Sequence, residues 1–541
     1  MIRFSDVTFT YDGAGHPTLE RVDLKVGEGE LCVVVGPTGS GKTTLLRAIN
    51  GLVPHFTGGR LVGEVLVDGR STRDFPPREL ADVVGMVGQN PAASFVTDVV
   101  EDELAYTMEN LGLAPEVMRR RVEDALDLLS LHELRNRPLA TLSGGQQQRV
   151  AIGAVLTASP RVLVLDEPTS ALDPAAAEEV LSSLTRLVHD LGLTVLLAEH
   201  RLERVLPFAD SVVLVPGGGR TLVVGPAAEV MRTSPVAPPL VDLGRLSGWS
   251  PLPLSVRDAR RQAGSLRLRL EGAAPRPTPA ADREASVEAR LSKASVHYDR
   301  VVALDAVSLE VRAGEVVAIM GRNGSGKSTL LSQLAGVRPP NSGSVAVGGV
   351  NPSSLAPRAL VARVGLVPQD AGIILYSNSV GSECAAADRD TGLPPGTTAA
   401  VLERVLPGLP VDRHPRDLSE GQRLALALAI VLAPAPPLLL LDEPTRGLDY
   451  PGKARLVRLL TELAASGHAV VIATHDVELV AQLATRAVVL AEGEVVADGR
   501  ARDVVCHSPV FAPQVAKVLA PDPWLTVDEI RVALNAETVH G

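Results

Sequence analysis

Short, uninterrupted apolar runs recur along the chain, and glycine-rich or acidic residues follow each of them. LCVVV (31–35) precedes GPTGSGKTT, RVLVL (161–165) precedes DEPTS, and VLLA (195–198) precedes EHRLE. Apolar runs of this length are typical of strands buried in a parallel sheet, whose carboxyl edge then carries the polar residues. The start of the chain, MIRFSDVTFTYDG, instead alternates apolar and polar residues and predicts a half-buried strand rather than a signal peptide.

The whole pattern occurs twice along the chain. VVAIM (316–320) precedes GRNGSGKST. LSGGQ, as LSEGQ, recurs roughly 280 residues later, and so do LDEPT and the histidine after the next apolar run. A further repeat, SPVAPPLVDLGRLSGW (234–249) and SPVFAPQVAKVLAPDPW (508–524), ends each copy and holds both tryptophans. We therefore predict a first domain at 1–232 with a small extension at 233–265, a linker rich in Pro and Ala at 266–286, a second domain at 287–506 and its extension at 507–541.

Composition narrows the classes of partner. The net charge of −11 argues against a surface built to bind nucleic acid, and three widely spaced cysteines predict neither a disulfide framework nor a metal site. The uncharged stretch LALALAIVLAPAPPLLLL (424–441) has nearly the length of a membrane span. Its three prolines split it, so we expect a short helix followed by a core strand.

The two glycine-rich stretches match a phosphate-binding loop in full. Backbone N–H groups and a helix N-terminus would hold a polyphosphate there, with Lys42 and Lys327 reaching the β- and γ-phosphates and Thr43 and Ser328 on Mg²⁺. The nucleotide-binding residues expected in these loops are Gly36, Thr38, Gly39, Ser40, Gly41 and Thr44 in the first copy, and Gly321, Asn323, Gly324, Ser325, Gly326 and Thr329 in the second.

Acidic residues and a histidine follow two further apolar runs in each copy. Asp166 and Asp442 suit Mg²⁺, and Glu167 and Glu443 suit a base that polarises an attacking water. His200 and His475 are placed to contact a γ-phosphate. The alternatives are a strand-end pair that caps the next helix and a structural histidine.

The runs LSGGQ and LSEGQ complete the pattern, because Ser143 with Gly145 and Ser419 with Gly421 predict a second anion-binding helix start in each copy. With the other motifs, they make the chain similar to the nucleotide-binding domains of ATP-binding-cassette proteins over about 85% of its length. The resemblance implies two tandem α/β P-loop domains, each with a mainly parallel sheet, an antiparallel β part and a helical subdomain.

The same resemblance implies how ATP and Mg²⁺ would be bound. Two domains of one chain would pair head to tail, so that Ser419 and Gly421 close over ATP on Lys42, while Ser143 and Gly145 close over ATP on Lys327. Tyr11 and Tyr298 stand where the family stacks an aromatic ring on adenine; the alternative is a core strand position. Gln89 and Gln369 would link the nucleotide and its Mg²⁺ to the membrane face.

The segment QNPAASFVTDVVEDELAY (89–106) resembles energy-coupling-factor importers of vitamins and metal ions, and EHRLE (199–203) resembles their cobalt and thiamine-precursor branch. This implies an ATPase at the cytoplasmic face of the membrane that drives separate coupling and substrate-binding subunits. Phe95 and Val96 are then candidate contacts with the membrane partner. The second copy has Leu375 in place of Phe95 and lacks Asn-Pro, which favours two unlike motors. The alternatives are a generic or sugar-type importer, an exporter motor, and a twin cassette that acts on ribosomes or DNA.

Overall fold

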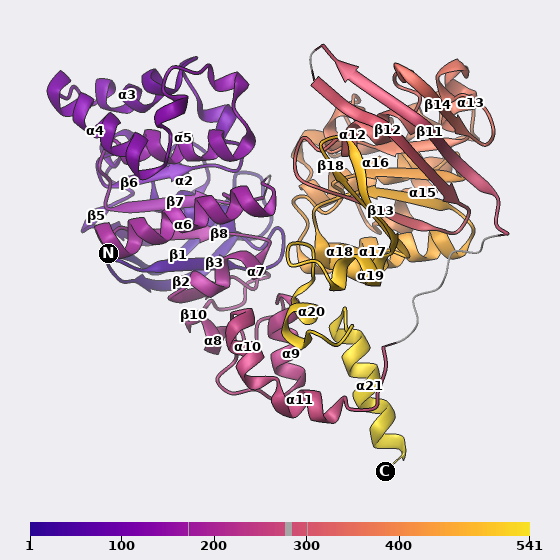
Figure 1. Cartoon of the computed structure of the whole chain (residues 1–541). Helices are drawn as coiled ribbons and strands as arrows, with labels where there is room; N and C mark the ends of the chain where they lie inside the picture. Colours follow the sequence, from indigo (N-terminus) through magenta and orange to yellow (C-terminus); the bar gives the residue numbers. More distant parts are fainter. Residues whose placement is uncertain (171, 276–283, 300, 541) are drawn as a thin grey trace. The chain divides into compact units, whose positions relative to one another are not determined.

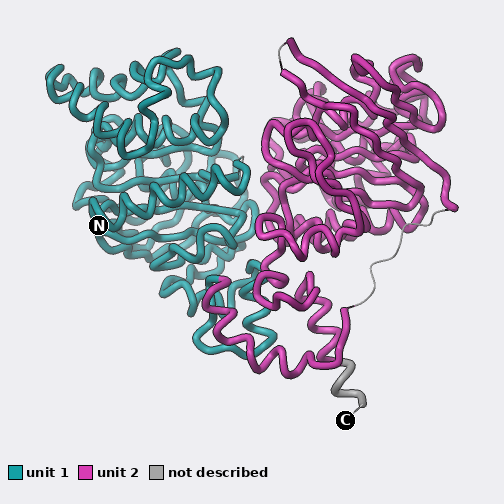
Figure 2. The backbone as a smooth tube through the Cα atoms, viewed as in Figure 1, with its two compact units in different colours: residues 1–255 teal, residues 256–541 magenta. Residues whose placement is uncertain are grey.

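The chain forms two compact units, residues 1–255 and 256–541, in a computed structural model that describes residues 1–170, 172–275, 284–299 and 301–540 (Figure 2). Each unit has a six-stranded, mainly parallel sheet and a smaller antiparallel sheet. The predicted fold class, two tandem α/β cassettes in one chain, is confirmed.

In unit 1 the parallel sheet has the strand order β10-β9-β3-β8-β7-β6, and the antiparallel sheet has the order β2-β1-β4-β5. The strands are β1 (Ile2–Thr10), β2 (Leu19–Val26), β3 (Leu31–Val35), β4 (Arg60–Val67), β5 (Arg70–Ser71), β6 (Val84–Val87), β7 (Val162–Asp166), β8 (Thr194–Ala198), β9 (Ser211–Leu214) and β10 (Val223–Pro226). Every residue of β3, β7 and β8 is buried, as the uninterrupted apolar runs predict for strands covered on both faces.

The helices of unit 1 are α1 (Lys42–Ile49), α2 (Leu52–His55), α3 (Val100–Asn110), α4 (Pro115–Leu128), α5 (Gly144–Leu156), α6 (Pro174–Leu191), α7 (Leu202–Val205), α8 (Ala227–Val230) and α9 (Pro239–Leu246). Figure 1 shows α3, α4 and α5 together at one end of the unit, next to the edge strand β6. Asp173 caps α6 by accepting from the N–H of Ala176, and Gly192 ends the helix in the left-handed conformation. The apolar face of α6 is buried, so the helix covers the parallel sheet.

Unit 2 repeats this architecture, with sheets ordered β15-β16-β17-β13-β18-β19 and β12-β11-β14. Its strands are β11 (Val287–Tyr298), β12 (Val301–Arg312), β13 (Val316–Met320), β14 (Ser342–Val347), β15 (Val364–Val367), β16 (Leu438–Asp442), β17 (Ala469–Ala473), β18 (Arg486–Ala491) and β19 (Glu494–Arg500). Its helices are α10 (Val256–Gln262), α11 (Gly264–Arg269), α12 (Lys327–Leu334), α13 (Pro357–Val361), α14 (Val380–Thr391), α15 (Thr397–Val405), α16 (Glu420–Leu432), α17 (Tyr450–Ala465), α18 (Val477–Leu483), α19 (Ala501–Cys506), α20 (Gln514–Leu519) and α21 (Val527–His540).

The apolar stretch 424–441 divides as its prolines predict. Its first part completes α16 and its last part forms β16, and both lie in the core of unit 2. Among the described residues, no helix combines the length and the apolar character that a membrane crossing requires.

Helices α10 and α11 pack on the predicted second extension, 507–541. Arg260 Nε donates to the carbonyl of Lys517 at 2.6 Å, and Arg267 donates to the carbonyl of Val518 at 2.9 Å. The two arginines thus supply hydrogen bonds to carbonyl groups in the last turn of α20, which lack partners within the helix. Helix α11 reaches into the predicted linker 266–286, of which residues 276–283 lie outside the described part of the chain. The domain boundaries stay a prediction.

Candidate functional site

The two glycine-rich loops connect a buried central strand to a helix, β3 to α1 and β13 to α12. Gly41 and Gly326 precede these helices with φ of 103° and 102°. A Cβ atom on Gly41 would lie 3.0 Å from the carbonyl oxygen of Thr18, and one on Gly326 would lie 2.3 Å from that of Ala303. Only glycine fits both the conformation and the space, and the tight turn leaves the helix N-terminus open toward the loop.

Each loop curls around its lysine. Lys42 Nζ donates to the carbonyls of Gly36 at 2.9 Å and Pro37 at 3.0 Å, and Lys327 Nζ makes the equivalent bonds to Gly321 and Arg322, both at 2.9 Å. The same two loops contain the other predicted phosphate-binding residues, namely Thr38, Gly39, Ser40, Thr43 and Thr44, and Asn323, Gly324, Ser325, Ser328 and Thr329.

Two buried serines show that these loops fit a phosphate. Within the described residues, the hydroxyl oxygens of Ser40 and Ser325 are buried and have no hydrogen-bond partner. A buried hydroxyl without a partner destabilises the fold, so each serine lacks an acceptor that a polyphosphate oxygen would supply. Each hydroxyl lies in a loop that also holds an ammonium group and a helix N-terminus.

The predicted Mg²⁺ ligands meet at the carboxyl edge of each parallel sheet. Asp166, the last residue of β7, is hydrogen-bonded to Thr43, and Asp442, the last residue of β16, is hydrogen-bonded to Ser328. Burial first, and then the adjacent glutamate, raises the pKa of both aspartates.

These oxygens fit Mg²⁺. Asp442 Oδ1 is buried and has no hydrogen-bond partner in the described part of the chain. The described residues hold no cluster of three or more His, Cys, Asp or Glu that could bind a metal by itself. One carboxylate beside one hydroxyl suits Mg²⁺, which is commonly held by few protein ligands together with substrate phosphates.

The predicted base and histidine are in direct contact in both cassettes. His200 Nε2 lies 2.9 Å from Glu167 Oε1, and His475 Nδ1 lies 2.7 Å from Glu443 Oε1, so the two imidazoles use different ring nitrogens. Burial tends to raise the pKa of Glu167, but hydrogen bonds from His200 and Gln89 outweigh it and lower the pKa below its usual value. Glu167 is therefore held as a carboxylate, the form that a general base requires.

The backbone at both glutamates has an unusual conformation that the sequence did not predict. Glu167 and Glu443 have φ of 54° and 48°, and their N–H groups donate to Ala198 and Ala473 of the neighbouring strand at 2.9 and 2.8 Å. A left-handed conformation is uncommon outside glycine and is often found at active sites. The conformation places each glutamate beside the histidine that follows the neighbouring strand.

The predicted second anion-binding helix starts are present as helix N-termini. Ser143 caps α5 and Ser419 caps α16, each in a capping box with the glutamine three residues later. A Cβ atom on Gly145 would lie 2.8 Å from the Cβ of Ala176, and one on Gly421 would lie 3.1 Å from Leu448 Cδ2. Each of these two helices, α5 and α16, which we call the signature helices, therefore packs closely on the segment that follows DEPT in its own cassette.

The remaining predicted residues lie at the margins of the sites. The Tyr11 hydroxyl is 3.0 Å from Thr44 Oγ1, whereas Tyr298 is exposed and carries the Arg338 guanidinium 4.9 Å above its ring. Gln89 and Gln369 are exposed just beyond the ends of β6 and β15. Their roles, like those of the other predicted site residues, stay predictions.

Within EHRLE, Glu199 contributes only to a family resemblance, and the sequence predicts no role for it in the site. Glu199, directly before His200, is 2% exposed and accepts hydrogen bonds from Thr169. The available signal was its place in AEHR, where a carboxylate interrupts the end of an apolar strand.

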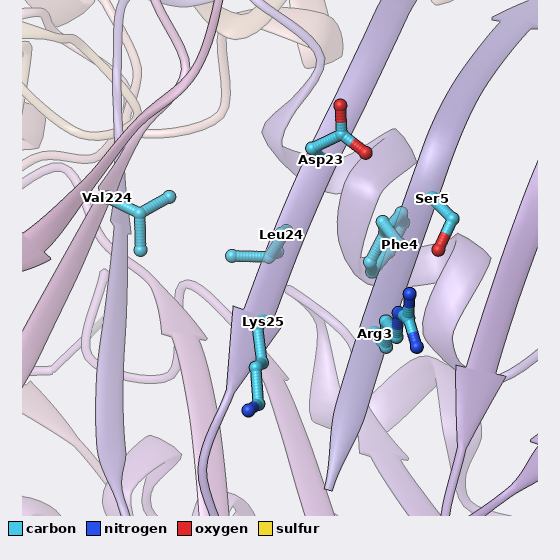
Figure 3. Close-up of a pocket in the computed structure, with 7 residues that line it drawn as sticks. All are labelled: Arg3, Phe4, Ser5, Asp23, Leu24, Lys25 and Val224. Atoms are coloured by element: carbon cyan, nitrogen blue, oxygen red, sulfur yellow. The ribbon is translucent and has the colours of Figure 1, made fainter.

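A separate pocket of about 420 Å³ is lined by β1 and β2 of the antiparallel sheet of unit 1 and by β10 of its six-stranded sheet (Figure 3). The residues that line it are Arg3, Phe4, Ser5, Asp23, Leu24, Lys25 and Val224. None of them is a predicted site residue, so the phosphate loops and this pocket are distinct features.

Comparison with known proteins agrees with this geometry. The ABC transporter family model matches residues 19–170 and 304–446. A Streptomyces avermitilis protein named "Putative ABC transporter ATP-binding protein" is 62% identical, over 99% of this chain and 100% of its own length.

A solved structure of similar length shows the same fold, and a second, shorter one matches part of the chain. Archaeal ABCE1, from a model with Pelota on the ribosome, has a TM-score of 0.63 at 21% identity, over 95% of this chain and 82% of its own. Clostridium perfringens cbiO1, described as part of the ABC transporter complex cbiONQ, covers 43% of this chain and 90% of its own, with 28% identity and a TM-score of 0.38. The chain belongs to the ABC transporter family, as an ATPase with two cassettes that bind ATP and Mg²⁺.

Proposed function

We propose that this ATPase drives solute import through separate integral membrane subunits, in a transporter of the energy-coupling-factor type. The observation that carries the proposal is the exposure of apolar side chains directly after Gln89 and Gln369. Val96 is 60% exposed, and in the second cassette Ile373 is 59% and Tyr376 is 82% exposed. Exposed apolar side chains gathered on one segment are typical of a protein–protein contact.

Buried glutamates hold both segments in place. Glu103 Oε2 accepts from the N–H groups of Val96 and Thr97 and from the Thr97 hydroxyl, at 2.8 to 3.0 Å. Glu383 Oε2, at the matching position, accepts from the N–H of Ser377 at 2.5 Å. A segment fixed by its backbone presents its apolar side chains at little entropic cost, which suits the docking of an apolar helix.

The energy-coupling-factor assignment rests on the sequence of the first segment, QNPAASFV, and on EHRLE. The two segments differ, so the two cassettes would contact unlike surfaces of a coupling subunit. A substrate-binding subunit would then select the solute, a vitamin or a transition-metal ion. The chain itself would lie at the cytoplasmic face of the membrane as a peripheral protein.

We further propose that hydrolysis uses the same residue types in each cassette. Lys42 and Lys327 would turn from the loop carbonyls to the phosphates, while Glu167 and Glu443 accept a proton from the attacking water. The bound Mg²⁺ would neutralise phosphate charge beside Asp166 and Asp442. The two cassettes would pair head to tail, each signature helix closing over the ATP of the other.

The test places a charge on the exposed segment. Val96→Asp should abolish co-purification with integral membrane subunits from detergent-solubilised membranes, because a carboxylate would be buried against an apolar helix. Val496→Asp is the matched control, since Val496 is 58% exposed on β19. ATP binding should be unchanged in both variants.

Retention of the membrane subunits by Val96→Asp would contradict the proposal. So would co-sedimentation of the wild-type chain with ribosomes that survives high salt, because it would favour a twin cassette that acts on ribosomes.

A further inference from the structure

The carboxylate of Glu199 connects two parts of the first cassette. Its Oε1 accepts from the N–H of Thr169 at 2.7 Å and from the Thr169 hydroxyl at 2.6 Å, and its Oε2 accepts from the N–H of His200 at 3.1 Å. A buried carboxylate needs such donors, because burial and then the nearby Glu167 raise the pKa of Glu199 and the bonds from Thr169 oppose this rise. Glu199 thereby joins the residue that contacts the base to the loop that follows the base.

That loop also supports the signature helix. Arg204 donates to the carbonyl oxygens of Thr169 at 3.0 Å and Leu172 at 3.3 Å. Leu172 Cδ2 lies 3.6 Å from where a Cβ atom of Gly144 would stand, at the first turn of α5. Hydrogen bonds therefore run from His200 through Glu199 to Thr169, and Arg204 joins Thr169 to Leu172 beside the start of α5.

The second cassette lacks this connection. Thr474 stands in place of Glu199, and the hydroxyl of Thr445, which matches Thr169, is buried and has no hydrogen-bond partner in the described part of the chain. Thr474 instead donates to Glu443 Oε2 at 3.3 Å. A separate ion pair, Lys453 with Asp476 at 2.8 Å, joins α17 to the start of α18.

We propose that Glu199 is a positioning residue found only in the first cassette, which sets Thr169 against His200 and so fixes both the Glu167–His200 pair and the start of α5. Glu199 touches no reacting atom; it acts through His200 and Thr169. Its loss would misplace the base without removing any phosphate ligand. We expect a lower kcat at a nearly constant KM for ATP. When kcat is calculated from the measured concentration of active sites, a general loss of folded protein does not lower it.

The test compares the two matched threonines. Thr169→Val removes the hydroxyl bonded to Glu199, whereas Thr445→Val removes a hydroxyl without a partner in the described residues. In a Glu443→Gln background, where only the site that contains Lys42 hydrolyses ATP, we expect Thr169→Val to lower kcat about tenfold, with KM within about twofold, because small displacements of a catalytic group are costly. Thr169→Ser keeps the hydroxyl and should restore kcat, and Thr445→Val should stay within about twofold of the wild type.

An equal fall of kcat in the Thr169→Val and Thr445→Val variants would overturn the proposal. So would a Thr169→Ser variant whose kcat stays as low as that of Thr169→Val. If Thr169→Val does not fold, Glu199→Gln decides the matter. Its amide oxygen can still accept from Thr169, but its NH₂ group cannot accept from the N–H of His200. A folded Glu199→Gln enzyme with wild-type kcat would refute the role of Glu199, and a lower kcat at constant KM would support it.

Discussion

Glu420 replaces a glycine at the start of α16, the helix that would close over ATP on Lys42 in the proposed head-to-tail pairing, so the effect of its charge on hydrolysis can be tested quantitatively. Glu420 is paired with Arg423 at 3.5 Å, and the carboxylate side chain is 40% exposed. At about 5 Å an unpaired charge would repel a phosphate charge by about 1 kcal/mol in water and about 3 kcal/mol at an effective dielectric constant of about 20. Arg423 offsets most of this, so the net cost should fall below about 1 kcal/mol.

The first cassette carries the uncharged version of the same pair, Gly144 and Gln147. Glu420→Gly should therefore raise ATP turnover by less than about fivefold. Arg423→Gln should lower it by more, because the carboxylate is then left without its partner. The double variant should return close to the wild-type rate.

The assay is steady-state ATP hydrolysis with a double-mutant cycle, so that the coupling between the two residues is measured directly. Each variant would also carry Glu443→Gln, which restricts hydrolysis to the site that contains Lys42. An increase above about tenfold in Glu420→Gly, or additive effects in the double variant, would refute the conclusion that Arg423 neutralises Glu420.

Two further predictions concern buried groups. Gln333 is 1% exposed, and neither of its amide atoms has a hydrogen-bond partner in the described residues, so Gln333→Met should raise the free energy of unfolding by about 2 kcal/mol in urea titrations; a decrease would contradict this. Burial raises the pKa of Asp166 and Asp442, and Mg²⁺ binds the ionised form, so the Mg²⁺ concentration for half-maximal ATPase activity should rise as the pH falls through these raised pKa values. A Mg²⁺ requirement that stays constant as the pH is lowered from neutral to the ordinary pKa of an aspartate would contradict this reasoning.

The repeated motifs predicted the elements that carry them. Strands, phosphate loops and the acidic edge depend on local sequence, because an uninterrupted apolar run fixes a buried strand and the next residues then lie at its carboxyl end. This is why β3 with Lys42 and β7 with Asp166 lie where the sequence places them.

Contacts between distant segments could not be predicted in this way. The hydrogen bond from Thr169 to Glu199 spans 30 residues, and that from Arg267 to Val518 spans 251. The left-handed conformation of Glu167 depends on its bond to Ala198 in the neighbouring strand. No periodicity encodes such contacts, because they depend on which strands become neighbours in the sheet.

The most direct test of the central claim, that each cassette holds one ATP and one base, is the nucleotide content and turnover of the Glu167→Gln/Glu443→Gln double variant. With Mg²⁺ present, this chain should retain two ATP molecules and lose hydrolysis, because both phosphate loops stay intact while both bases are neutral. One bound ATP per chain, or turnover close to that of the wild type, would contradict the account.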